Sequence, residues 1–118
     1  MQGETDGNSA KMVRLSPKTS ASLPRTMVAK RIVFAGKVQG VGFRYATKEI
    51  ARSFDVCGWV KNMPDGTVEL QIMAETDSEL EGFLNELTEE SSVAHHIQSM
   101  HAQVIPPLEG VKGFRIER

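Results

Sequence analysis

Residues Gly36–Arg44, with the sequence GKVQGVGFR, join an apolar segment to an amphipathic one through three glycines and end on an arginine. The apolar segment, residues 31–36, is short, β-branched and aromatic, which is typical of a buried strand. Apolar side chains then recur at helical spacing through residues 45–54. The glycines therefore stand where a strand gives way to a helix that begins near Phe43 or Arg44.

This junction has the composition of an anion site. The first N–H groups of a helix lack intrahelical acceptors, and the helix dipole adds partial positive charge there. Gly36, Gly40 and Gly42 can adopt positive φ and let successive N–H groups converge on one anion. Arg44 adds a planar fork that matches two phosphate or carboxylate oxygens. The pattern predicts phosphoryl binding, although glycines at such a junction also occur in purely structural turns, and the Lys-Ser or Lys-Thr of a nucleotide P-loop is missing.

A second segment, residues 58–70 with the sequence GWVKNMPDGTVEL, is typical of a β-hairpin closed by a Pro-Asp-Gly turn. Asn62 comes at the end of the first strand, on the same face as Val60. Two interpretations of Asn62 remain open. Asparagine is favoured next to turns, and its amide also offers a donor and an acceptor to a water or a substrate group.

The two segments together resemble the acylphosphatase family. G-x-V-Q-G-V-x-F-R at residues 36–44 and G-W-V-K-N-x-x-x-G-x-V at residues 58–68 are similar in residue type, order and separation to the family's two signatures. The resemblance extends from about residue 29 to Arg118 and includes a last strand near residues 113–116. Ala74 stands where the second signature usually closes with glycine, which is expected to affect a turn away from the anion site.

The resemblance implies hydrolysis of acyl phosphates to a carboxylate and inorganic phosphate, without a metal or another cofactor. It implies two catalytic residues, Arg44 to clamp the phosphoryl oxygens and Asn62 to orient the attacking water. The phosphoryl group of a small-molecule acyl phosphate is then expected to be bound by Gln39, Gly40, Val41, Gly42, Phe43 and Arg44.

The remaining chain predicts the same architecture. A strand at residues 68–72 is followed by a helix that opens at residues 76–79 with a Thr or Asp cap. Strands are expected at residues 96–104 and 113–117. The order βαββαβ plus a terminal strand predicts a ferredoxin-like α+β sandwich, with both helices on one face of an antiparallel sheet and long side chains over the other face.

Composition limits the chain to one small domain. The 118 residues carry a net charge of -1; residues 1–27 hold four basic and two acidic residues, so the remainder carries -3. A nucleic-acid surface is not expected from this balance. Residues 1–27 are interpreted as a disordered tail, in which Met27 is an alternative start, and residues 28–118 as the acylphosphatase-like domain. We expect a cytoplasmic monomer, with no membrane span or secretion signal.

The cysteine and the three histidines are expected to have structural rather than catalytic or metal-binding roles. Cys57 is the single cysteine, which excludes an intramolecular disulfide, and it is expected to be a small buried hydrophobe. His95, His96 and His101 lack further ligands at metal-binding spacing, so a solvated strand start with His95 and His96 on opposite faces is expected. A noncatalytic anion-binding domain remains the alternative function, while seven aromatics and an acidic balance disfavour an RNA-binding sheet.

Overall fold

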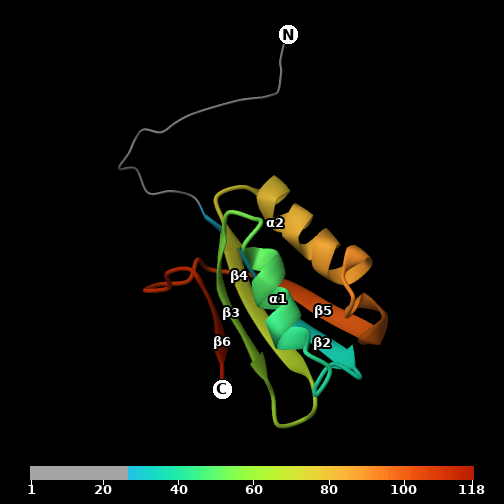
Figure 1. Ribbon diagram of the computed structural model, residues 1–118. Helices are drawn as coiled ribbons and strands as arrows, with labels where there is room; N and C mark the ends of the chain where they lie inside the picture. The colour runs from blue at the N-terminus through green and yellow to red at the C-terminus, as the bar shows by residue number, and fades with distance from the viewer. Residues whose placement is uncertain (1–26) are drawn as a thin grey trace, which may run out of the picture.

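The computed structural model of the protein describes residues 27–118 (Figure 1). The elements follow in the order β2 (Val28–Gly36), α1 (Phe43–Ala51), β3 (Val56–Asn62), β4 (Val68–Ala74), α2 (Asp77–Asn85), the π-helical turn η2 (Glu86–Glu90), the 3-10 turn η3 (Ala94–His96), β5 (Ile97–Ile105) and β6 (Phe114–Glu117). This succession confirms the predicted βαββαβ order with a terminal strand. The predicted disordered tail lies outside the described residues, apart from Met27.

The five strands form one sheet in the order β5-β2-β4-β3-β6. Antiparallel pairing joins β2 to β4 and to β5, and β3 to β4. The four strands of the βαββαβ unit are antiparallel, as predicted, and the extra last strand β6 runs parallel to β3. β5 runs opposite to β3 at one edge of the sheet. Between β5 and β6 the chain passes to the other edge and reverses direction, so β6 runs the same way as β3. The ferredoxin-like α+β fold is confirmed with a mixed sheet.

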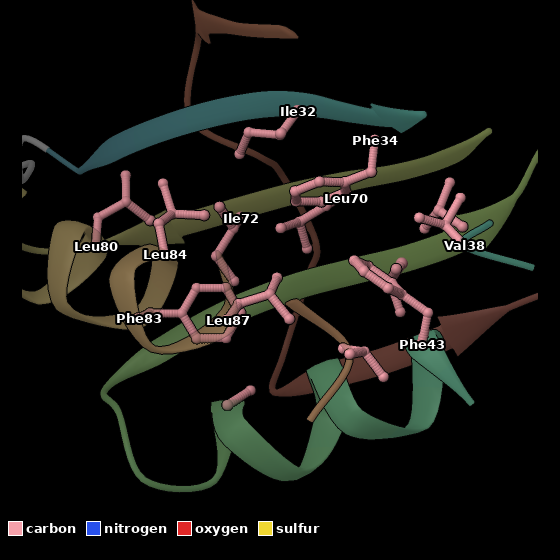
Figure 2. Close-up of a cluster of buried hydrophobic side chains, with 14 of the residues drawn as sticks. Ile32, Phe34, Val38, Phe43, Leu70, Ile72, Leu80, Phe83, Leu84 and Leu87 are labelled. Atoms are coloured by element: carbon pink, nitrogen blue, oxygen red, sulfur yellow. The ribbon is translucent and has the colours of Figure 1, made fainter. Parts of the chain in front are cut away.

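Both helices cover the same face of the sheet, as predicted (Figure 1). The core lies between the sheet and the helices, and Figure 2 shows side chains from both layers pointing into it. Phe34 of β2 and Phe43 of α1 are fully buried, with ring centroids 5.1 Å apart. Thr47, also buried, donates its hydroxyl to the carbonyl of Phe43 at 2.8 Å. The contact between the two rings holds the first turn of α1 against β2, and the glycine segment connects these two elements.

The second helix begins as its sequence predicts. Thr76 is the N-cap and its side chain accepts a hydrogen bond from the N–H of Glu79 at 3.1 Å. The buried face of the helix is apolar and continues past α2 into η2, with Leu80, Phe83, Leu84 and Leu87.

Long polar side chains cover the other face of the sheet, as expected. Arg31 donates to both carboxylate oxygens of Glu69, at 3.0 and 3.2 Å. The side-chain amide of Gln71 donates to Glu69 at 2.8 Å. Glu69 is only 7% exposed, so these bonds are what allow its carboxylate to be buried. Within residues 27–118 neither helix has the length and apolar character needed to cross a bilayer.

Candidate active site

The segment between β2 and α1 forms an open loop above the helix N-terminus. Gly40 has φ 78° and Gly42 has φ 81°, in the left-handed region that favours glycine. A Cβ added at either position would meet no other atom within 4 Å, so the loop borders open space. Gly42 is the N-cap of α1, and no side chain of the described residues caps the helix. The first hydrogen bond into α1 runs from the N–H of Ala46 to Gly42, which leaves the preceding N–H groups for a ligand.

A pocket of about 270 Å³ lies at this helix end. Its wall combines the glycine loop, the first turn of α1, the end of β3 and the end of the chain beside β6. The lining residues are Val38, Gly40, Gly42, Phe43, Arg44, Tyr45, Asn62, Ile116 and Arg118. Two of them are arginines and none has an acidic side chain, so the lining side chains favour an anion.

Arg44 reaches the pocket from the first turn of α1. Its Nη1 donates to the carbonyl oxygen of Glu117 at 3.3 Å, so the last strand helps to orient the guanidinium. The guanidinium has five N–H donors, and one contact leaves most of them available to a ligand. β6 thus contributes to the site through its main chain, which the sequence alone did not indicate.

Asn62 reaches the same pocket from the end of β3. It lies opposite Val68 in the β3–β4 hairpin, next to the turn. Val60, two residues earlier on the same face, is fully buried, and this anchors the strand end beneath the pocket. The fold therefore brings together Arg44 and Asn62, the two residues that the motifs singled out as catalytic.

The structure separates the six predicted phosphate-binding residues into two groups. Gly40, Gly42, Phe43 and Arg44 line the pocket. Gln39 and Val41 do not: the Gln39 side chain is hydrogen-bonded to the β3–β4 hairpin, and Val41 packs against the core. The side chains of these two residues are therefore held by the hairpin and the core rather than by the pocket.

Three residues that line the pocket, Tyr45, Ile116 and Arg118, were not predicted from the sequence as site residues. Tyr45 is 65% exposed and was counted only as an apolar position of the helix. Ile116 and Arg118 reach the site because β6 pairs beside β3, with Val60 opposite Ile116. Pairing at the edge of a sheet leaves no signal in the local sequence, so the positions of Ile116 and Arg118 could not be predicted. For Tyr45, the one signal was an aromatic residue directly after Arg44.

The other reactive residues lie elsewhere. Cys57 is in β3, opposite Met73, and partial burial, with a smaller contribution from Asp55, raises the pKa of its thiol. A raised pKa lowers the thiolate fraction, which agrees with an inert cysteine. The expectation for His95 and His96 is corrected: they belong to η3, not to a strand, and their rings stack with centroids 4.0 Å apart.

Comparison with known proteins identifies the family. The acylphosphatase family model matches residues 30–116, most of the chain. This chain belongs to the acylphosphatase family. It is 40% identical over 72 residues to an acylphosphatase of Methanospirillum hungatei JF-1, covering 61% of this chain and 78% of that relative. The crystal structure of acylphosphatase from Bacillus subtilis superposes with a TM-score of 0.67 at 32% identity, covering 77% of this chain and 99% of that one.

The acylphosphatase fold also occurs within a larger protein. Full-length HypF in its phosphate- and nucleotide-bound form matches with a TM-score of 0.70 and 26% identity, over 83% of this chain but 13% of HypF. Family membership confirms the resemblance inferred from the two motifs. Ala74, the departure from the family pattern, ends β4, is 1% exposed and pairs with Val28 and Val56. It is not a pocket-lining residue.

Proposed function

We propose that this chain hydrolyses acyl phosphates to a carboxylate and inorganic phosphate without a metal ion. The guanidinium of Arg44 and the main-chain N–H groups of residues 39–43 hold the phosphoryl oxygens. The side-chain amide of Asn62 holds the attacking water. The observation that carries this proposal is that Arg44 and Asn62, from two separate motifs, line one pocket with the glycine loop at a helix N-terminus.

The reaction suits a site without a strong nucleophile. The water oxygen bonds to phosphorus while the bond between phosphorus and the bridging oxygen breaks, and the carboxylate leaves with that bonding pair. Because a carboxylate is a good leaving group, positioning and charge stabilisation account for most of the catalysis. The water proton passes to a phosphoryl oxygen of the substrate. Tyr45 and Ile116, which also line the pocket, are the side chains proposed to contact the acyl group.

The alternative is a noncatalytic anion-binding domain, which would use the glycine loop and Arg44 in the same way. The position of Asn62 favours hydrolysis over this alternative. An anion receptor needs no water-holding amide beside the phosphoryl group, whereas in-line attack does.

The test is hydrolysis of benzoyl phosphate in excess EDTA, with inorganic phosphate as a competing ligand. Arg44→Ala is expected to lose about 100- to 1000-fold in kcat and to bind phosphate weakly, because a preorganised donor is worth about 2.7–4 kcal/mol in the transition state. Arg52→Ala is the matched control, since Arg52 follows the same helix, its side chain is 68% exposed, and its one ion pair within residues 27–118 is with Glu49. An Arg44→Ala variant within threefold of wild type contradicts the proposal.

Asn62→Ala separates the two roles. It is expected to lower kcat by at least tenfold and to leave the phosphate inhibition constant within about threefold, because its partner is the water. Asn85→Ala, at the exposed end of α2, is the control. Phosphate binding without turnover in the wild-type protein establishes the noncatalytic alternative instead.

We further propose that the protein acts as a monomer in the cytoplasm and does not bind nucleic acid. A single cysteine agrees with a reducing compartment, and the acidic balance disfavours nucleic acid. Gel filtration with light scattering tests the monomeric state, and a filter-binding assay with RNA tests the absence of nucleic-acid binding.

A further inference from the structure

The side chain of Gln39 turns away from the pocket and makes two hydrogen bonds inside the protein. Its Nε2 donates to the carbonyl oxygen of Met63 and to that of Thr67, each at 2.8 Å. The contacts are partly buried and connect residues 24 and 28 positions apart in the chain. A primary amide has two N–H donors, so this group can satisfy both carbonyls at once.

The two acceptors are the residues on either side of the β3–β4 turn. The N–H of Met63 donates to the carbonyl of Thr67 at 2.9 Å, and the N–H of Gly66 donates to the carbonyl of Met63 at 3.1 Å. Each carbonyl therefore accepts one bond within the hairpin and a second from Gln39. The amide of Gln39 bridges the two residues that flank the turn and fixes the position of the hairpin relative to the glycine loop.

This contact joins the two halves of the site. Gln39 directly precedes Gly40 of the loop, and Met63 directly follows Asn62. Loop and hairpin come from separate elements, and a shift of either would change the distance between the phosphoryl group and the water. Small misplacements of reacting groups are costly, since about 1 Å is worth on the order of 100-fold in rate.

We propose that Gln39 is a positioning residue for Asn62: its side-chain amide holds the water-binding asparagine in line with an anion bound to the glycine loop. This inference rests on the proposed function of Asn62. It gives the Gln39 side chain a task of its own, apart from the main-chain N–H that the proposed function uses.

Gln39→Met tests the proposal, because methionine keeps the unbranched length and the main-chain N–H but has no amide donors. Gln39→Glu keeps the shape and places carboxylate oxygens against two carbonyls. Gln103→Met is the matched control, since Gln103 is an exposed glutamine of β5. Each variant is made in the wild type and in Asn62→Ala, and benzoyl phosphate kcat and the phosphate inhibition constant are measured.

In the wild-type background, Gln39→Met and Gln39→Glu are expected to lower kcat at least tenfold and to change the phosphate inhibition constant less than threefold. In the Asn62→Ala background the same substitutions are expected to lower kcat less than twofold further, because there is no asparagine left to position. A side chain that merely stabilises the fold would not give this coupling. Equal losses in both backgrounds, or a phosphate inhibition constant that rises in proportion to the loss of kcat, overturn the proposal.

A readout without turnover keeps this inference separate from the proposed function. Phosphate is titrated into labelled protein, and the amide resonances of Met63 and Thr67 and the side-chain amide of Asn62 are followed by NMR. We expect phosphate to shift all three in wild type and in Gln103→Met, and to leave the Met63 and Thr67 amides unshifted in a folded Gln39→Met variant. Unmoved hairpin resonances in phosphate-saturated wild type overturn the coupling, whereas failure to hydrolyse benzoyl phosphate contradicts only the proposed function.

Discussion

Alanine at position 42 is expected to damage the anion site far more than it damages the fold. Gly42 is the N-cap of α1 with φ 81°, and its backbone borders the pocket. Gly110 has a similar φ of 72° in an exposed loop and is not a pocket residue. A Cβ at either glycine meets no atom within 4 Å. Gly110→Ala therefore reproduces the backbone cost of Gly42→Ala without its effect on a bound anion.

The two contributions can be separated by magnitude. A non-glycine residue in the left-handed region costs roughly 1–2 kcal/mol, which in a domain of this size corresponds to a fall in Tm of about 4–16 °C. Both variants are expected to show that fall. At position 42 the added methyl group also occupies space that borders the bound phosphoryl group. Alanine keeps its own N–H, but the methyl group is expected to push the phosphoryl group off a preorganised loop donor, which costs about 2.7–4 kcal/mol in the transition state, near a 100- to 1000-fold loss of kcat.

The assay pairs thermal unfolding with benzoyl phosphate hydrolysis at a temperature at which both variants are folded. Calorimetric titration with phosphate gives the affinity of the folded protein. We expect Gly110→Ala to match wild type in turnover and phosphate affinity after correction for the folded fraction. The reasoning is refuted if Gly42→Ala keeps kcat within threefold of wild type, or if Gly110→Ala loses as much activity as Gly42→Ala.

Three further outcomes are expected. Phe83→Ala should lower the free energy of unfolding by about 3–5 kcal/mol in urea titrations, because the ring is fully buried, whereas Met100→Ala on the exposed face of β5 should stay within about 0.5 kcal/mol. Burial raises the pKa of the Cys57 thiol, so iodoacetamide should alkylate it only at higher pH than a free cysteine. The contribution of the protonated thiol to the free energy of unfolding should be present at neutral pH and fall as pH rises through that pKa. Hydrogen bonds from Thr67 lower the pKa of the Asp65 carboxyl. The stability that these bonds contribute should be present above the ordinary carboxyl pKa and be lost as pH falls through the lowered value. In Thr67→Val, NMR titration should show a higher pKa for Asp65 than in wild type.

Local patterns in the sequence were sufficient for most of the fold. Each of the two helices begins at a recognisable signal, the glycine loop before Phe43 and the Thr76 cap. The β3–β4 hairpin follows from Pro64, Asp65 and Gly66 between two β-branched runs. These features depend on φ preferences and on hydrogen bonds between near neighbours, which a short stretch of chain specifies by itself.

Long-range pairing was harder to infer. The adjacent His95 and His96 were expected at a strand start, but η3 turns them before β5 begins. Periodicity does not distinguish a 3-10 turn from the first residues of an irregular strand. The parallel course of β6 was also missed, because a strand of four residues carries no information about which edge it joins or in which direction.

The sequence by itself determined the family, the order of the elements and the residues proposed to hold an anion and a water. Those residues lie in two short motifs, and each motif needs only its own glycines, turn and cap to take its shape. The tertiary structure alone decided how the motifs meet. It put Asn62 and Arg44 in one pocket, brought Ile116 and Arg118 to its wall, and turned the side chain of Gln39 onto the hairpin. These contacts arise when the helices and strands pack around a common core, and no local propensity encodes the distance between two elements separated in the chain.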